Sequence, residues 1–184
     1  LFKRALAIRE KKLPPDHTDM AATLHNLASL YQTQGRNAEA EPLFKQALAI
    51  WEKTLGPRHH YVGTNCNNLA QLYVAEGRYD EAERLMKKAL ALFEKVNGPE
   101  HENVAMVKNN LGMMYFLSAC YEEAEPMLKQ AAAIWEAALG PEHPNALTAR
   151  GNLAHLYSAM RRYDEAEPLF LRTQETMEKV LGPD

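Results

Sequence analysis

The stretch NNLAQLYVAEGRYDEAERLMKKAL, residues 67–90, decides the fold of this chain. A related stretch, HNLASLYQTQGRNAEAEPLFKQAL, begins forty-two residues earlier, and another, NNLGMMYFLSACYEEAEPMLKQAA, begins forty-two residues later. Residues 15–56 and 57–98 are identical at 20 of 42 aligned positions. The chain is therefore built from an internal repeat, and its architecture follows from one repeated unit.

A proline marks the start of each unit, at Pro15, Pro57, Pro99, Pro141 and Pro183. We expect one solenoid domain in which the second helix of a truncated repeat (1–14) precedes four full repeats, 15–56, 57–98, 99–140 and 141–182. The chain opens in the middle of a unit and without an initiator methionine, so we also expect it to be a piece of a longer protein.

Each unit shows the hydrophobic period of two helices. In the first unit the two apolar stripes are Met20, Leu24, Leu27, Ala28 and Tyr31, and Ala40, Leu43, Phe44, Ala47, Ile50 and Trp51. Gly35 between the stripes and Gly56 before Pro57 are typical helix stops. A helical hairpin with one apolar side cannot bury that side alone, so the sequence predicts an all-α, right-handed α-solenoid of stacked hairpins.

Small residues hold two fixed phases of the repeat, where we expect helix backbones to approach closely. They are Ala28, Ala70, Gly112 and Ala154, and Ala40, Ala82, Ala124 and Ala166.

The two ends of the array differ from its middle. In 141–182, polar Thr173, Gln174 and Thr176 replace Ala47, Leu48 and Ile50 of the first unit, which is typical of a terminal, capping repeat. At the other end the truncated unit lacks a partner helix. We expect it to leave an apolar patch that favours self-association, formed by Leu1, Phe2, Leu6 and Ile8.

Composition excludes several classes of function. The net charge of −3 and the pI near 6.2 argue against a nucleic-acid-binding protein, and no apolar run is long enough to span a membrane. The two cysteines, Cys66 and Cys120, occupy different phases of the repeat. This arrangement favours unpaired thiols and a cytoplasmic location.

The pattern predicts no enzyme, metal or cofactor. His17, His59, His101 and His143 recur once per unit, each separated from the next by a whole hairpin, whereas zinc ligands must converge on one point. No phosphate-binding loop or nucleophile motif occurs, and nothing supports a nucleophilic role for either cysteine.

The motif Asn-Leu-Ala-x-Leu-Tyr, followed by Gly-Arg-Tyr-x-Glu-Ala-Glu and then by Ala-Leu and Gly-Pro-x-His, resembles the tetratricopeptide repeat. Its 42-residue length and its Asn-Asn pair are similar to the kinesin light chain form. The resemblance implies a non-enzymatic scaffold that binds a peptide in a concave groove lined by the first helix of each hairpin. It implies four groove stripes: Ala22, His25, Asn26 and Ser29; Thr64, Asn67, Asn68 and Gln71; Met106, Asn109, Asn110 and Met113; Thr148, Gly151, Asn152 and His155.

One position of these stripes is asparagine in every unit, and we call it the asparagine ladder: Asn26, Asn68, Asn110 and Asn152. A carboxamide both donates and accepts hydrogen bonds, so the ladder can hold a peptide backbone without reading side chains. The alternative is that each asparagine ties neighbouring helices together. The two roles can coexist.

Two features of the groove bear on ligand choice. Met106, Met113, Phe116 and Leu117 make the third unit the most apolar, which predicts either a pocket for a bulky side chain or packing on an adjoining helix. Lys108 and Arg150 are the cations next to the ladder, and they predict a mild preference for acidic peptides with a modest response to salt.

The leading hypothesis is thus a scaffold for a protein or peptide partner, with no nucleic-acid or membrane partner. The alternative is a structural module that forms homo-oligomers through its exposed N-terminal helix, its solenoid ends or its convex face. A third possibility, the adaptor portion of a larger enzyme or receptor, depends on flanking sequence.

Overall fold

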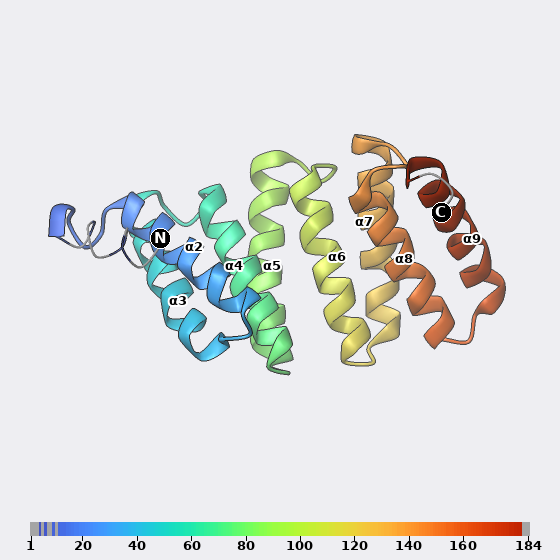
Figure 1. Cartoon of the computed structure of the whole chain (residues 1–184), viewed down its shortest axis with the longest axis horizontal. Coiled ribbons are helices and arrows are strands. Elements are labelled where there is room, and N and C mark those ends of the chain that lie inside the picture. Colours follow the sequence, from blue (N-terminus) through green and yellow to red (C-terminus); the bar gives the residue numbers. More distant parts are fainter. Residues whose placement is uncertain (1–3, 5, 7–8, 10, 182–184) are drawn as a thin grey trace. The chain divides into compact units, whose positions relative to one another are not determined.

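The computed structural model describes residues 4, 6, 9 and 11–181, and every regular element among them is a helix (Figure 1). The all-α class is therefore confirmed. No helix in this part of the chain is both long and apolar enough to cross a bilayer. The helices are α2 (Thr18–Thr33), α3 (Asn37–Thr54), α4 (His60–Ala75), α5 (Tyr79–Asn97), α6 (Glu102–Leu117), α7 (Tyr121–Leu139), α8 (Pro144–Ala159) and α9 (Tyr163–Leu181).

The chain forms two compact units, residues 1–92 and 93–184. In the first unit α2 packs against α3, and α4 packs against both of them. In the second unit α6, α7, α8 and α9 pack in succession, and α8 also contacts α6 (Figure 1). Hairpin thus stacks on hairpin inside each unit, which is the packing of an α-solenoid.

The apolar stripes of the sequence form the interface between hairpins. Met20, Leu24, Leu27, Ala28 and Tyr31 of α2 are all buried. The buried residues of α3 are Ala40, Phe44, Ala47 and Trp51, while Leu43 and Ile50 at the edges of its stripe are half-buried. Burial of a large aliphatic or aromatic side chain contributes about 1.5–3 kcal/mol. The stripes therefore supply the main force that stacks the hairpins.

The turn inside each hairpin requires a left-handed backbone. Gly35 and Gly77 adopt it with φ of 70° and 73°. In the next two repeats the same place is held by Ala119 (φ 61°) and Arg161 (φ 59°), which lack the freedom of glycine. The packing of the two helices therefore sets the conformation of this turn, and glycine only makes it less costly.

The small residues do allow close approach, most clearly at Gly112 of α6. A Cβ atom on Gly112 would lie 2.7 Å from Cγ of Leu128 and 3.2 Å from Cβ of Met127, both on α7. A second helical glycine, Gly151 of α8, has nothing within 4 Å of the corresponding point, and Gly63 of α4 is a third glycine inside a helix. Close packing therefore leaves no room for a larger residue at Gly112, whereas a Cβ atom would fit at Gly151.

We expect Gly112→Ala and Gly151→Ala to change stability in opposite directions. Alanine favours a helix over glycine by about 0.8–1 kcal/mol, so Gly151→Ala should stabilise the fold. At Gly112 this gain is opposed by overpacking of about 1–3 kcal/mol, so the net effect should be destabilising. Urea unfolding of both variants measures the difference, and equal shifts of the two midpoints would contradict the close contact.

A carboxylate on one hairpin binds the next hairpin, in an arrangement that we call the clasp. Tyr73 Oη donates to Glu41 Oε1 at 3.0 Å, and Arg78 Nη1 donates to Glu41 Oε2 at 2.9 Å. The Arg78 guanidinium also lies 3.8 Å from the centre of the Tyr73 ring. Hydrogen bonds from Arg78, and then from Lys45, lower the pKa of Glu41 to about 2.

The second unit repeats the clasp with the equivalent residues. Tyr157 Oη donates to Glu125 Oε1 at 3.1 Å, and Arg162 Nη1 donates to Glu125 Oε2 at 2.5 Å. The pKa of Glu125 is also lowered to about 2, mainly by hydrogen bonds from Arg162. A polar contact thus recurs with the same geometry at two hairpin junctions.

The clasp predicts a specific loss of stability in acid. A carboxylate whose pKa is lowered on folding stabilises the fold above its ordinary pKa of 4.5, and this contribution falls as the pH drops from about 4.5 toward 2. Glu41→Gln should cost about 1–3 kcal/mol at pH 7 and progressively less below pH 4. Chemical denaturation across this range tests it. Exposed Glu175→Gln is the control, and a pH-independent cost at Glu41 would be inconsistent with the clasp.

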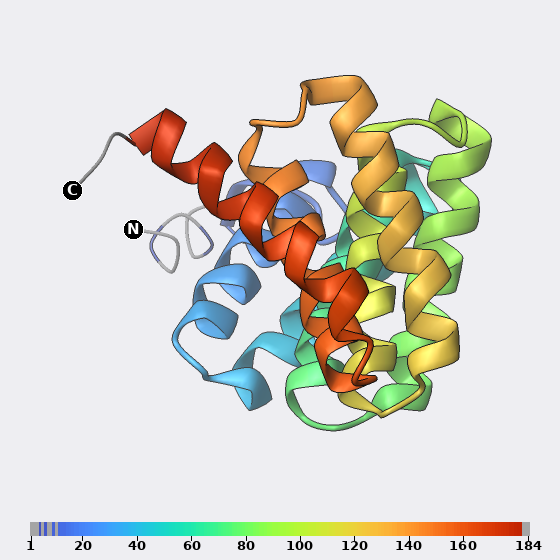
Figure 2. The ribbon, with the colours of Figure 1, turned by 90° about the vertical axis from the view of Figure 1, so that its right-hand side faces the viewer.

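The last helix of the described chain exposes apolar side chains. Leu171 of α9 is 53% exposed and Phe170 is 37% exposed, although Phe44 and Leu128 at the phase of Phe170 are fully buried. Figure 2 shows α9 in front of α8 at this end. The polar Thr173 bonds to a carbonyl of its own helix, and the capping role of this repeat stays a prediction. Of the predicted N-terminal patch only half-buried Leu6 is described, while Leu1, Phe2 and Ile8 lie outside the described residues.

Candidate functional site

The four histidines that recur in the sequence begin the first helix of each hairpin. Nδ1 of His17, His59, His101 and His143 accepts a hydrogen bond from the backbone N–H two residues later, at 3.1–3.3 Å. Each histidine is the N-cap of its helix. Among the described residues, no group of three or more His, Cys, Asp and Glu side chains lies close enough to hold a metal ion. The regular spacing of these histidines therefore reflects helix capping.

We expect His101→Ala to destabilise the fold by about 0.5–2 kcal/mol, the usual effect of losing an N-cap acceptor. His101→Asn should retain most of the stability because asparagine is a strong N-cap. Thermal unfolding of both variants distinguishes them. Equal destabilisation by alanine and asparagine would argue against the capping role.

A cavity of about 330 Å³ in the first unit contains part of the predicted groove. Four of the predicted stripe residues line it, namely Ala22, His25, Asn26 and Thr64. Its other lining residues are aromatic: Trp51, His60 and Tyr61. Trp51 and Tyr61 are stacked with ring centres 5.1 Å apart, and His25 lies 5.5 Å from Trp51. The cavity therefore combines amide and hydroxyl groups with an aromatic wall.

A second cavity, of about 520 Å³, lies between α8 and α9 of the second unit. It is lined by the entire predicted stripe of the fourth repeat, Thr148, Gly151, Asn152 and His155. Phe170 and Met177 of α9 add apolar surface, and the His155 and Phe170 rings meet edge to face at 5.1 Å. Two stretches of the predicted groove thus lie in concave surface.

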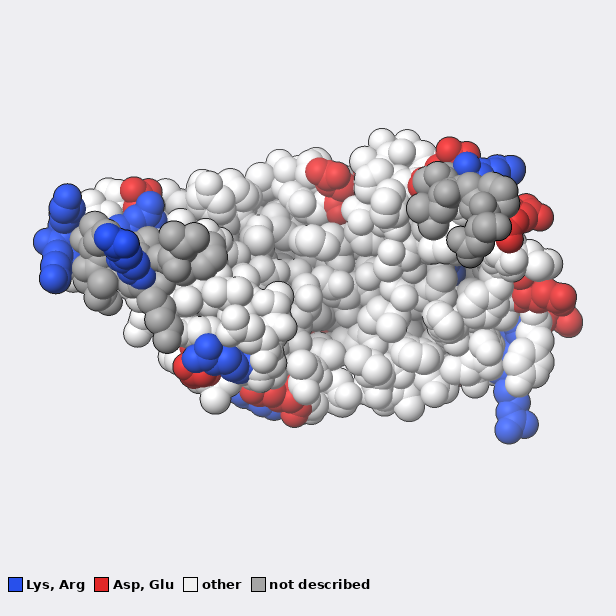
Figure 3. Space-filling model, in the orientation of Figure 1, with Lys and Arg blue, Asp and Glu red and all other residues white. Residues whose placement is uncertain are grey.

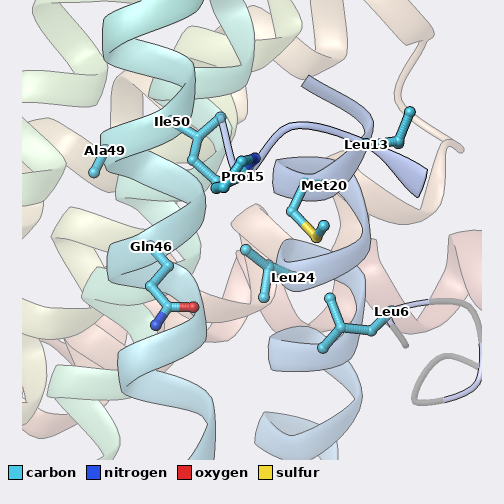
Figure 4. Close-up of a pocket in the computed structure, with 8 residues that line it drawn as sticks. All are labelled: Leu6, Leu13, Pro15, Met20, Leu24, Gln46, Ala49 and Ile50. Carbon is cyan, nitrogen blue, oxygen red and sulfur yellow. The ribbon is translucent and has the colours of Figure 1, made fainter. Parts of the chain in front are cut away.

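A third cavity, of about 460 Å³, lies away from the predicted groove residues. Figure 4 shows the described residues of its lining, among which Gln46 is the single polar side chain. Leu6 belongs to this lining, so the described part of the N-terminal patch faces a hollow (Figure 4). The other lining residues are Leu13, Pro15, Met20, Leu24, Ala49 and Ile50.

The structure places the predicted site residues at very different depths. Exposed residues are Asn26, Gln71 and His155; half-buried residues are His25, Ser29, Asn68, Met106, Asn110, Met113 and Asn152; buried residues are Asn67, Lys108, Asn109 and Arg150. The exposed and half-buried residues are accessible to a ligand, whereas the buried residues belong to the interior.

Two members of the asparagine ladder bond to the neighbouring hairpin. Asn68 Nδ2 lies 3.4 Å from Nε2 of His25, and Asn152 Nδ2 donates to Asn109 Oδ1 at 2.9 Å. Asn26 is exposed. The ladder therefore ties helices together at two junctions, as the alternative interpretation expects, while the side chains at these junctions remain partly accessible.

The two cations beside the ladder point into the protein. Arg150 is 1% exposed, and its guanidinium donates to Glu136 Oε1 at 2.5 Å and to the Pro141 carbonyl at 3.3 Å. Lys108 is 8% exposed, and its Nζ lies 3.4 Å from Oε1 of Glu94. Both side chains are neutralised by carboxylates of their own unit, so they offer little charge to a ligand.

The methionine-rich part of the third repeat contributes to the core. Met113 and Phe116 are partly buried and pack against a cluster that includes Leu128, Leu153 and Tyr157. This packing agrees with the second of the two interpretations, contact with adjoining helices. Leu117 is 55% exposed and lies outside that cluster.

The two cysteines are free thiols. Cys66 is fully buried, and burial raises the pKa of its thiol to about 11. A thiol with that pKa is mainly protonated at neutral pH, and the protonated form is the unreactive one. Cys120 is exposed.

Sequence reasoning missed the aromatic wall of the first cavity and the α9 side of the second. Trp51 and Phe170 lie in second helices, whereas the sequence predicts a groove lined by first helices. His60 and Tyr61 begin α4. One signal was present: His60 and Tyr61 are replaced by Glu102 and Asn103 in the next repeat, so this aromatic pair is specific to one repeat.

Comparisons with known proteins agree with the repeat architecture. The family model described as Tetratricopeptide repeat matches residues 1–53, 19–95, 62–119 and 103–179. No curated protein matches the chain. The solved structure of nearly identical TPR-like repeats from a putative kinesin light chain of Podosopora anserina is 30% identical. It has a TM-score of 0.79, and the match covers 99% of this chain and 86% of that one.

Two further solved structures are similar. BtubC (BKLC) from P. vanneervenii is 26% identical with a TM-score of 0.87, over 100% of this chain and 73% of that chain. A Rap protein complexed with Competence and Sporulation Factor is 22% identical with a TM-score of 0.82, over 96% and 47% of the two chains. The last similarity concerns the fold alone.

Proposed function

The chain belongs to the tetratricopeptide repeat family, and we propose that it is a scaffold that binds an uncharged peptide segment of a partner protein. In each compact unit the proposed binding surface is the groove face of its own first helices. Asn68 and the smaller cavity belong to the first unit, and Asn152 and the larger cavity belong to the second, with each asparagine as a backbone-binding group and each cavity as a side-chain pocket. The scaffold acts by holding its partner and not by catalysis. Its unpaired thiols fit the reducing cytoplasm, which we propose as its location.

One observation carries this proposal: polar but uncharged side chains of the predicted stripes line hollows of about 330 and 520 Å³. Hollows of this size match the volumes in which small ligands and single side chains bind. A carboxamide beside such a hollow can bind the peptide backbone while the hollow takes a side chain. The complex of the similarly folded Rap protein is an example of this fold with a second molecule bound.

The charge of the surface supports an uncharged ligand. None of the sixteen stripe residues is Asp, Glu, Lys or Arg, and Glu142 is the charged residue that lines the larger cavity. Lys108 and Arg150, the nearest cations, are buried in ion pairs. In Figure 3 charged side chains are sparse on the face that is shown. Binding should therefore depend on hydrogen bonds and apolar contacts, which respond little to salt.

Selection of random nonapeptides on immobilised protein, followed by fluorescence polarisation, tests this function. We expect a saturable isotherm whose Kd changes less than about twofold between low salt and about 0.5 M NaCl. Asn68→Ala with Asn152→Ala should weaken binding by about tenfold, because each lost hydrogen bond contributes about 0.5–1.5 kcal/mol. The control is Gln130→Ala, which changes an exposed polar residue of α7.

Failure to select any peptide, or equal affinity of the double variant and the control, would refute the groove. A steep fall of affinity with salt would instead indicate charged contacts with the partner. The unfolding midpoint of each variant, measured in parallel, shows whether weaker binding comes from a damaged fold.

The second candidate function is self-assembly, and the exposed apolar residues of α9 favour it. Tyr163 is 61% exposed, Leu171 53% and Met177 45%. Apolar side chains that are exposed together on one helix are a common basis of subunit contacts. Light scattering over a range of protein concentrations separates the two functions, since a mass that rises with concentration, without peptide binding, supports assembly.

A further inference from the structure

His25 of α2 bonds to α4 through both of its ring nitrogens. Nδ1 lies 2.9 Å from Oδ1 of Asn65, and Nε2 lies 3.4 Å from Nδ2 of Asn68. Asn65 is fully buried, and its Nδ2 donates to the Phe44 carbonyl on α3 at 2.9 Å. These four residues form one chain of hydrogen bonds, which we call the relay, running through α4, α2 and α3.

The direction of the relay follows from its inner end. A backbone carbonyl can only accept, so the amide end of Asn65 must face Phe44 and its oxygen must face His25. His25 Nδ1 therefore carries the proton that Asn65 accepts. A neutral imidazole has one proton, so Nε2 is the acceptor, and Asn68 must donate to it through Nδ2. Each orientation is fixed by the one before it.

The neutral state of the ring has a physical cause. His25 lies 5.4 Å from the ring of Phe44 and 5.5 Å from that of Trp51, and burial lowers the pKa of its imidazole. His25 lines the cavity of about 330 Å³ in the first unit, and the other titratable groups that line it are His60 and Tyr61 of α4. Burial lowers the pKa of His60 as well, so that imidazole is also mainly neutral at pH 7.

The second unit contains an equivalent hydrogen bond with the same order of donor and acceptor, but without a histidine. Asn109 occupies the repeat position of His25, and Asn152 that of Asn68. Asn152 donates through Nδ2 to Asn109 Oδ1 at 2.9 Å. In both units, therefore, the ladder asparagine directs its amide end to the preceding hairpin.

We propose that His25 is a positioning residue that fixes the Asn68 carboxamide with its oxygen free for a ligand, so that this part of the groove selects N–H donors. This inference rests on the proposed function and names the chemistry that the same surface recognises. In the relay Asn68 Nδ2 is engaged, and no described side chain bonds to its Oδ1. The matching ligand group is an unsubstituted backbone N–H, which a proline or an N-methylated residue lacks.

The first test needs no peptide. Nitrogen-15 NMR of the imidazole distinguishes the two neutral tautomers, and the relay requires His25 in the Nδ1–H form at pH 7.5. Asn65→Ala should remove this preference, because the group that accepts the Nδ1 proton is lost. The Nε2–H form in the unaltered protein would overturn the inference, even if peptides bind.

The second test uses a nonapeptide from the library selection, with each backbone N–H methylated in turn. Loss of at least about tenfold in affinity at one or two positions is expected, since a methyl group removes the donor and clashes with the acceptor. Uniform tolerance of methylation would overturn the selection of N–H donors. If no nonapeptide binds, the proposed function fails, while the tautomer measurement still decides the relay.

The chain itself offers the matched variants. His25→Ala should weaken binding of that nonapeptide by about three- to tenfold, because Asn68 loses the acceptor that orients it. His25→Asn reproduces the pair seen at Asn109 and Asn152, so it should recover most of this loss. Equal weakening by alanine and asparagine would overturn the positioning role, because both remove the ring from its contacts with Phe44 and Trp51.

Discussion

Burial of apolar stripes between hairpins is the constraint on which the rest of this structure depends. A hairpin of this kind cannot cover its own stripe, so the stripe is buried against a neighbouring hairpin. Phe44 shows the effect: it is fully buried where α4 covers α3, whereas Phe170 at the same phase of α9 is 37% exposed. Among the described residues, the same chemical group is core or surface according to whether another helix covers it.

Polar contacts refine this stacking in a regular way. Glu41 and Glu125 each accept hydrogen bonds from the tyrosine and arginine of the following hairpin, and each N-cap histidine begins a first helix. The N-cap histidines recur at 42-residue intervals and the two clasps lie 84 residues apart, because equivalent junctions present the same donors and acceptors. A repeated polar residue in a solenoid therefore has a structural explanation before it has a functional one.

The candidate groove depends on residues that vary among the repeats. The position of His25 is asparagine in the next two repeats and glycine in the fourth, and the aromatic pair of His60 and Tyr61 occurs once. The ladder asparagine is constant, yet its orientation depends on a variable residue of the preceding repeat. His25 orients Asn68 in this way, and Asn109 orients Asn152. The stacking of the hairpins and the orientation of these asparagine side chains are thus linked through hydrogen bonds.

The sequence by itself determined the all-α repeat, the buried stripes, the left-handed turn at Gly35 and the small residue at Gly112, because all of these follow from periodicity within one unit. Only the tertiary structure decided which side chains are buried and which line the cavities. Lys108 and Arg150 lie next to the ladder in sequence, but carboxylates on other helices draw them inward. Trp51 and Phe170 line the cavities from second helices. Helical periodicity gives the face of a side chain, whereas its burial and its partner depend on the neighbouring helix.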